Sequence, residues 1–285
     1  MNGMKFKPDY SLIEKWDSAT NNALPLAAPF VSQFNLASKR LHYLAACHGG
    51  DLESPTLKTV RREFDLFRPD VVILEGMPNT GEVSPSWYLD HCRSQAEQDF
   101  AAGGEASYAT VLAGERGIAF VSGEPSGRDL YDGLNAQGFS LHDHLGFNAS
   151  VVIKHHLHSG IVDDAGVAAL VENQARSTLH DIGIDDAAFT FDDFRAWYRD
   201  RMGSAFSLEH LAATDVSPSD APDANILQKI MSAADNVRDP HILKTIAQQL
   251  ETHAKVLVVY GSAHLGKQQP VLQKMLGPAQ HSKPF

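Results

Sequence analysis

Two histidines and one glutamate, residue types that can bind a metal ion or move a proton, each follow an apolar run of this sequence. They are His48, Glu75 and His264. Two imidazoles and a carboxylate are a common ligand set for hydrolytic divalent metals, because they leave coordination positions open for water and substrate. The same residues suit a metal-free scheme, in which one histidine takes a proton from water while Glu75 orients it. We favour the metal scheme.

Glu124 and Arg238 are candidates for the same site. Glu124 also follows an apolar run and could be a further metal ligand or a general base, or it could stabilise the start of a helix after Pro125. Arg238 could stabilise an oxyanion or bind a substrate carboxylate through paired hydrogen bonds. It could equally form a salt bridge with Glu75 or Glu124 and keep them ionised. Asp239 precedes a proline and is a candidate helix cap.

The apolar runs predict four buried strands, and these would position the candidate residues. The strands cover residues 41–47, 71–74, 118–121 and 255–260. Ser54-Pro55 is typical of a helix start, so the first two strands and that helix form a β-α-β unit with parallel strands. Continuous apolar strands are expected where helices cover both faces of a sheet. Ligands of such sheets bind at the carboxyl ends of the strands, which is where the candidate residues fall.

The remaining segments predict an α/β fold with a central, mostly parallel sheet flanked by helices. We expect residues 1–285 to form a single domain, and residues 138–235 to be a helical insertion or lid within it. Residues 1–38 are expected to be an irregular arm with one short helix. Helices are predicted at residues 84–101, 105–116, 149–158, 191–201 and 237–253.

A second group of histidines lies in the middle of the chain. Its members are His142, His144, His155, His156 and His158. Spacing this dense could bind a transition metal or haem, or a lid could deliver His144 or His155 to the strand-end site. We favour an exposed polar helix face without a ligand. His42 lies inside the first apolar run, and we expect it to be a structural residue whose ring is hydrogen-bonded within the protein.

Composition narrows the class of partner. The 285 residues carry a formal net charge of −11 and no run of lysine or arginine, which argues against binding to nucleic acid. No segment approaches the roughly 20 apolar residues of a membrane span, and residues 1–20 lack the apolar core of a signal peptide. We therefore expect a cytoplasmic protein without a membrane partner. The two cysteines are not a disulfide framework. The oligomeric state is not predictable.

Three segments resemble the TraB/PrgY/GumN and Tiki group, within a superfamily that includes erythromycin-esterase-like and ChaN-like proteins. They are Ala45-Ala46-Cys47-His48, the strand-end Glu75 and Gly261-Ser262-Ala263-His264. That group has two Gly-x-x-His turns with an acidic residue between them, and an arginine on the helix before the last strand, where Arg238 stands here. The first turn departs from the pattern, with Ala45 in place of glycine. The resemblance covers the sheet strands and not the helical middle.

The resemblance implies metal-dependent proteolysis for a Tiki-like protein, histidine–glutamate hydrolysis for an esterase-like one, and haem binding for a ChaN-like one. We predict a metal-dependent hydrolase of an amide (peptide) or ester bond, acting on a small molecule or peptide. His48, Glu75 and His264 would surround Mn, Co, Fe or Zn, with Glu124 and Arg238 in catalysis. The alternatives are a haem- or metal-binding protein without turnover, with haem on the middle histidines, and a metal-free esterase.

Overall fold

A computed structural model of the chain describes residues 5–15, 24–80, 83–96, 100, 104–157 and 164–283. The chain divides into two compact units. The first unit combines residues 1–124 and 238–285, and the second comprises residues 125–237. The sequence predicted one domain with an insertion at residues 138–235, whereas the second compact unit begins earlier, at Pro125.

The first unit is built on a six-stranded sheet with the strand order β4-β3-β5-β2-β1-β6. Strands β2, β5, β3 and β4 run parallel to one another, which confirms the predicted α/β fold with a mostly parallel sheet. The strands are β1 (Phe30–Leu36), β2 (Lys39–Ala46), β3 (Val71–Leu74), β4 (Ala119–Ser122), β5 (Lys255–Gly261) and β6 (Gln280–Ser282).

Two antiparallel strands complete the sheet, and the sequence analysis missed both. The expectation of an irregular arm up to residue 38 was wrong, because β1 pairs antiparallel with β2 along its whole length. Polar residues interrupt the apolar pattern of β1, which hides the strand in the sequence. Two of them are used in the pairing with β6: the Ser32 hydroxyl lies 2.9 Å from His281 Nδ1, and Gln33 Nε2 donates to the Ser282 hydroxyl at 3.1 Å.

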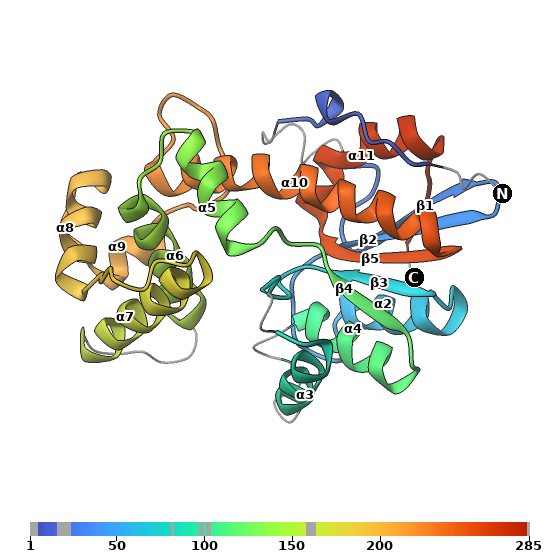
Figure 1. The fold of residues 1–285 in the computed structure, drawn as a ribbon, viewed down its shortest axis with the longest axis horizontal. Coiled ribbons are helices and arrows are strands. Elements are labelled where there is room, and N and C mark those ends of the chain that lie inside the picture. Colours follow the sequence, from blue (N-terminus) through green and yellow to red (C-terminus); the bar gives the residue numbers. More distant parts are fainter. Residues whose placement is uncertain are drawn as a thin grey trace. The chain divides into compact units, whose positions relative to one another are not determined.

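Helices cover both faces of the sheet (Figure 1). Helices α10 and α11 pack on one face, and α2, α3 and α4 lie on the other. Helix α2 begins as predicted, because the Ser54 hydroxyl accepts from Leu57 N–H and Pro55 occupies the first helical position. The helices are α2 (Pro55–Leu66), α3 (Pro85–Ala96), α4 (Gly104–Glu115), α10 (Ile226–Thr252) and α11 (Ser262–Leu276), with a 3-10 turn η1 (Tyr10–Leu12).

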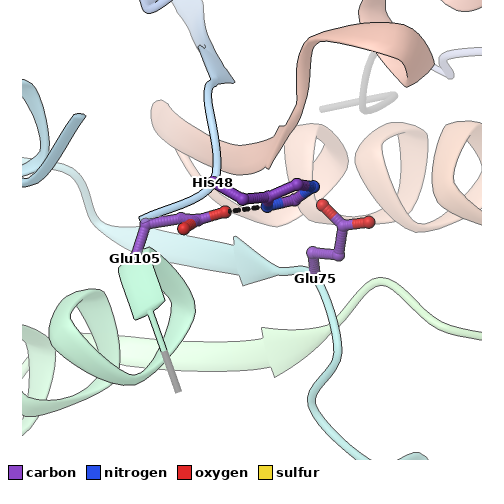
Figure 2. Close-up of side chains that lie close together, drawn as sticks. All are labelled: His48, Glu75 and Glu105. Carbon is purple, nitrogen blue, oxygen red and sulfur yellow. Dashed lines mark hydrogen bonds and ion pairs between the residues drawn. The ribbon is translucent and has the colours of Figure 1, made fainter. Parts of the chain in front are cut away.

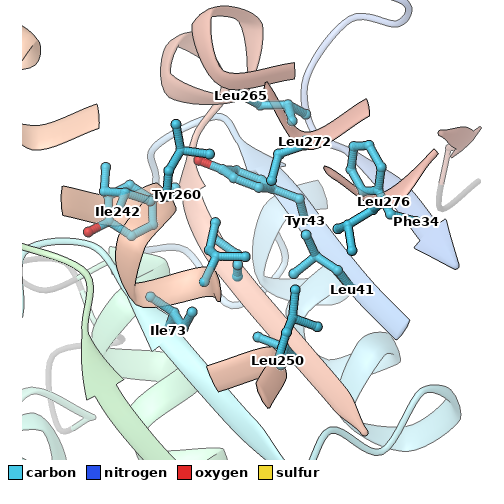
Figure 3. Close-up of a cluster of buried hydrophobic side chains, with 14 of the residues drawn as sticks. Phe34, Leu41, Tyr43, Ile73, Ile242, Leu250, Tyr260, Leu265, Leu272 and Leu276 are labelled. Atoms are coloured by element: carbon cyan, nitrogen blue, oxygen red, sulfur yellow. The ribbon is translucent and has the colours of Figure 1, made fainter. Parts of the chain in front are cut away.

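The core follows from the alternation of side chains along the strands. In β2, Leu41 and Tyr43 point to the α10–α11 face, whereas Leu44 and Ala46 point to the α2–α4 face. Both faces are buried, which explains the continuous apolar run in the sequence. Figure 3 shows the first of these cores, where Tyr43 and Tyr260 of the sheet pack with leucines of α11 and with Ile242 and Leu250 of α10.

The described part of the second unit consists of helices around its own apolar core, which includes Phe194, Trp197 and Tyr198. The helices are α5 (Gly127–Ala136), α6 (Leu141–His156), α7 (Asp164–Asp181), α8 (Phe191–Met202), α9 (Leu208–Ala213) and the start of α10. Helix α6 begins well before the predicted residue 149, because Ser140 and Asp143 form a reciprocal capping box. No helix among the described residues is long and apolar enough to cross a membrane.

Helix α10 also differs from its prediction. It begins at Ile226 rather than near residue 237, and it continues through Pro240. Proline lacks the N–H that would complete one turn of the helical hydrogen bonds, so the sequence indicated a helix start at that position. Asp239 therefore lies inside the helix and is not its cap.

Candidate metal centre

The parallel strands bring the predicted site residues to one edge of the sheet. His48 follows the end of β2, Glu75 follows β3 directly, Glu124 follows β4, and His264 lies in the first turn of α11 after β5. Helix α2 follows β2 on one face, whereas α11 follows β5 on the other, and these two strands are neighbours in the sheet. Divergent helices of this kind open the crevice in which ligands of α/β sheets bind.

His48 lies between two carboxylates (Figure 2). Its Nδ1 is 2.6 Å from Oε1 of Glu105, and its other ring nitrogen faces Glu75. Ligand atoms of His48, Glu75 and Glu105 all lie within 4.8 Å of one another, so these three residues form a group that could hold a metal ion. The hydrogen bond with Glu105 raises the pKa of His48 above its ordinary value, although burial opposes the shift. The His48 side chain is 69% exposed and therefore accessible from solvent.

Glu105 was not among the predicted site residues. It is buried in the first turn of α4, where the Gly49 N–H also donates to its Oε2 at 3.4 Å. The sequence offers one weak signal, a glutamate directly after Gly104. An acidic residue in the first turn of a helix is ordinarily explained by the helix dipole, so that signal did not distinguish a ligand from a stabilising charge.

Glu75 is held in place by donors from three directions. The Gly261 N–H donates to its Oε2 at 2.6 Å, Arg238 Nη2 donates to its Oε1 at 3.0 Å, and His264 Nε2 lies 3.6 Å from Oε1. Burial alone would raise the pKa of Glu75, but His264, Arg238 and His48 outweigh burial and hold that pKa well below its usual range. Glu75 is therefore a carboxylate, as a metal ligand must be.

Arg238 binds Glu75 and Glu124 together, so the predicted salt bridge forms with both. Its Nε and Nη2 each donate to Glu124 at 2.8 Å, in the paired geometry that arginine and carboxylates favour. Glu124 also accepts from Gly76 N–H and from the Tyr260 hydroxyl, both at 3.1 Å. Burial opposes ionisation of Glu124, yet Arg238 lowers its pKa. With its oxygens bonded inside the protein, Glu124 is arranged to anchor Arg238.

His264 lies beside Glu75 and is paired with Asp239 of α10. Its Nδ1 is 2.7 Å from Asp239 Oδ1, and both side chains are buried. Burial and Arg238 lower the pKa of His264, but Asp239 and Glu75 more than compensate and raise it to about 9. Burial would raise the pKa of Asp239, but His264 and Lys267 outweigh burial and lower that pKa to about 2.

The other histidines do not join this site. His42 is a structural residue, as expected: its Nδ1 is 2.6 Å from Glu63, and its ring stacks on Phe67. In the second unit, His144 is buried and packs beside Tyr131, whereas His142 and His155 are exposed. Within the ranges that the structure describes, no three potential ligands from the middle histidine group gather within 4.8 Å. His158 lies outside the described residues.

No protein-family model, curated protein or solved structure matches the chain. The resemblance to the TraB/PrgY/GumN and Tiki group therefore stays a prediction from the quoted residues.

Proposed function

We propose that the first unit binds a divalent transition metal through His48, Glu75 and Glu105, and that it hydrolyses an amide or ester bond at that metal. The observation that carries the proposal is the gathering of one imidazole and two carboxylates within 4.8 Å, at the carboxyl ends of parallel strands. The sequence predicted His264 as the third ligand, and Glu105 takes that position in the proposal.

The donor set fits Mn, Fe, Co or Zn, because one imidazole nitrogen and carboxylate oxygens suit these ions. Three protein ligands leave positions open, as catalytic metal sites require. When bound, such an ion supplies an activated water and polarises the carbonyl of a substrate. The exposure of His48 gives a substrate access to this side of the group.

Two more residues have places in the proposed reaction. His264 Nε2 points toward Glu75 and is near enough to exchange a proton with a water or substrate held beside Glu75. Arg238 keeps Glu75 ionised and presents a positive charge beside the group, where a developing oxyanion would be stabilised. Glu124 contributes by holding Arg238 in position.

A metal-free hydrolase is the second candidate, because one specific pair favours it. His264 and Asp239 form a buried imidazole–carboxylate pair at 2.7 Å, the arrangement that orients a histidine base in metal-free hydrolases. In that scheme the neutral form of His264 would take a proton from water through Nε2, and Glu75 would help to orient the ring, so activity should rise as the pH approaches the His264 pKa of about 9. The two candidates differ in their need for a metal ion.

Hydrolysis of a panel of nitrophenyl esters and fluorogenic peptides tests both candidates. The protein is assayed as purified, after exhaustive chelation, and after addition of Mn²⁺, Co²⁺, Fe²⁺ or Zn²⁺. The metal-dependent proposal predicts activity that chelation abolishes and one of these ions restores, and that His48→Ala lacks. His42→Gln is the matched control, because His42 belongs to another histidine–glutamate pair at 2.6 Å. Full activity after chelation would replace the first candidate with the second.

A further inference from the structure

The Asp239 carboxylate, behind His264, collects donors from three side chains of one helix. Its Oδ1 is 2.7 Å from His264 Nδ1 and accepts from Gln268 Nε2 at 2.6 Å, while its Oδ2 is 2.6 Å from Lys267 Nζ. In α11, Lys267 and Gln268 come three and four residues after His264, so all three side chains lie on one face of that helix. The two oxygens of Asp239 are therefore assigned to different partners.

The assignment is enforced by charge and by burial. Lys267 is 2% exposed and its ammonium group offers only donors, so Oδ2 stays with the lysine and Oδ1 faces the histidine. The Tyr43 hydroxyl donates to Gln268 Oε1 at 3.2 Å, which turns the Gln268 amide so that its N–H groups face Asp239. An ionised carboxylate only accepts, so His264 must carry a proton on Nδ1.

This arrangement costs free energy that the stability of the fold does not require. Burying a lysine and an aspartate costs several kcal/mol of desolvation, and apolar residues of similar size often stabilise a protein as well or better. In this site the buried pair has a directional effect. It keeps a proton on Nδ1, the nitrogen away from Glu75, so that Nε2, 3.6 Å from Glu75 Oε1, is the nitrogen that gains or loses a proton when the ring changes charge.

We propose that Asp239 and Lys267 are positioning residues of the strand-end site: Lys267 fixes the orientation of the Asp239 carboxylate, and Asp239 holds the proton of His264 on Nδ1. The consequence for catalysis rests on the proposed function, in which Nε2 of His264 exchanges a proton with the water or substrate held beside Glu75. The placement of the proton is independent of that function.

Asp239→Asn gives the sharpest test, because asparagine has one acceptor and one donor where aspartate has two acceptors. The charged Lys267 takes the amide oxygen, since leaving a charged donor unsatisfied costs more than leaving a neutral one. The amide NH₂ then faces His264 Nδ1, which must accept. In Asp239→Asn/Lys267→Met the competing donor is gone, so the amide oxygen turns back to His264 and its Nδ1 regains the proton.

The readout is the ¹⁵N and ¹H spectrum of the His264 ring in metal-free protein at a pH above 9, where the ring is neutral and only one nitrogen carries a proton, with the signal assigned by its loss in His264→Gln. We expect a protonated Nδ1 in the wild type, in Lys267→Met and in the double variant, and an unprotonated Nδ1 in Asp239→Asn. The matched control is Glu63→Gln, which alters the His42 pair and should leave the His264 signal unchanged. If Asp239→Asn does not fold, the wild type and the double variant still decide the question.

An unprotonated Nδ1 in the wild type would overturn the proposal, as would a protonated Nδ1 in Asp239→Asn or an unprotonated one in the double variant. The rate of metal-dependent hydrolysis supplies the functional readout: Asp239→Asn should lower it by about 100-fold or more, the contribution of a well-placed proton-transfer group, and the double variant should recover it. An unchanged rate in Asp239→Asn would overturn the link to the site. Failure of the wild type to bind Co²⁺ would contradict the proposed function, while the ring spectra would still test the proton placement.

Discussion

Single carboxylates determine the arrangement of the site, because particular neighbours hold each of them in place. Glu75 is bonded to Arg238 and the Gly261 N–H, and Glu105 is bonded to His48. From the sequence, Glu75 could be predicted because it ends an apolar strand. Glu105 could not, because its first-turn position in α4 has an ordinary explanation in the helix dipole and its approach to His48 is a tertiary contact.

Substitution of Glu105 tests its role as a ligand. We expect Glu105→Gln to retain the contact with His48 Nδ1, because the amide oxygen still accepts a hydrogen bond, but to bind Co²⁺ at least 10-fold more weakly, because a neutral amide is a poorer ligand. Isothermal titration calorimetry measures the affinity, with Glu63→Gln as the control. Wild-type affinity in Glu105→Gln would show that Glu105 orients His48 and does not bind the ion.

Removal of Arg238 should destabilise the first unit. Its side chain is 18% exposed, and those of Glu75 and Glu124 are 18% and 16% exposed, so Arg238→Met leaves two largely buried carboxylates without their cation. We expect a loss of about 3 kcal/mol in the free energy of unfolding. Arg238→Met/Glu124→Gln should recover part of this loss because one of the two charges is removed. Urea denaturation of the three proteins measures the effect, and equal stability of Arg238→Met and the wild type would refute it.

Elements of secondary structure were predictable where a single pattern dominated. The continuous apolar runs of β2, β3 and β5 predicted buried parallel strands, and those strands place His48 and Glu75 at one edge. Strand β1 carries polar residues that bond to β6, a partner from the far end of the chain, so no local pattern revealed it. Helix α10 was predicted too short because Pro240 is typical of a helix start.

The junction between β5 and α11 offers a test at the scale of elements. A Cβ at Gly261 would lie 3.0 Å from His48 Nε2 and 3.4 Å from Glu75 Oε2, whereas its φ of −53° is open to any residue. We therefore expect Gly261→Ala to change the free energy of unfolding by less than about 1 kcal/mol but to weaken metal binding, because the exposed His48 ring has to move away.

The control for that junction is Gly49→Ala, which is next to His48 in sequence but has open space around its Cβ. Both variants are compared by Co²⁺ titration and by thermal unfolding. If Gly261→Ala binds Co²⁺ like the wild type, the gap between His48 and Glu75 is not where the ion is held.

In the whole molecule, the proposed site lies in one of the two compact units. The residues of the proposed site all belong to the first unit, which includes Glu124 and Arg238 at its boundaries. The predicted insertion at residues 138–235 lies within the second unit. The lack of strand patterns indicated that stretch in the sequence. The start of the unit could not be predicted, because Pro125 directly follows Glu124, which comes just after β4 and belongs to the proposed site.

The second unit should lose stability in acid because of His144. Its ring is buried, its Nδ1 has no hydrogen-bond partner, and burial lowers its pKa to about 4. An unfolded histidine has a pKa near 6.5, so the unfolded state binds more protons between these two values and stability falls as the pH falls through this window. Between pH 8 and pH 5, protonation of His144 should lower the free energy of unfolding by about 2 kcal/mol.

Hydrogen exchange of the α6 amides at pH 8 and pH 5, corrected for the intrinsic exchange rates, measures this loss locally. In His144→Leu, which has no group to titrate, the acid-induced loss of protection should shrink by the same amount. A loss as large in His144→Leu as in the wild type would assign the acid sensitivity to other groups.

Elemental analysis tests the proposed metal centre on His48, Glu75 and Glu105. Purified, untagged protein is incubated with Mn²⁺, Co²⁺, Fe²⁺ and Zn²⁺, and free ions are removed. We expect close to one ion per chain in the wild type and in His42→Gln, and none in His48→Ala/Glu105→Ala. Metal-free wild-type protein, or an ion retained by the double variant, would contradict it.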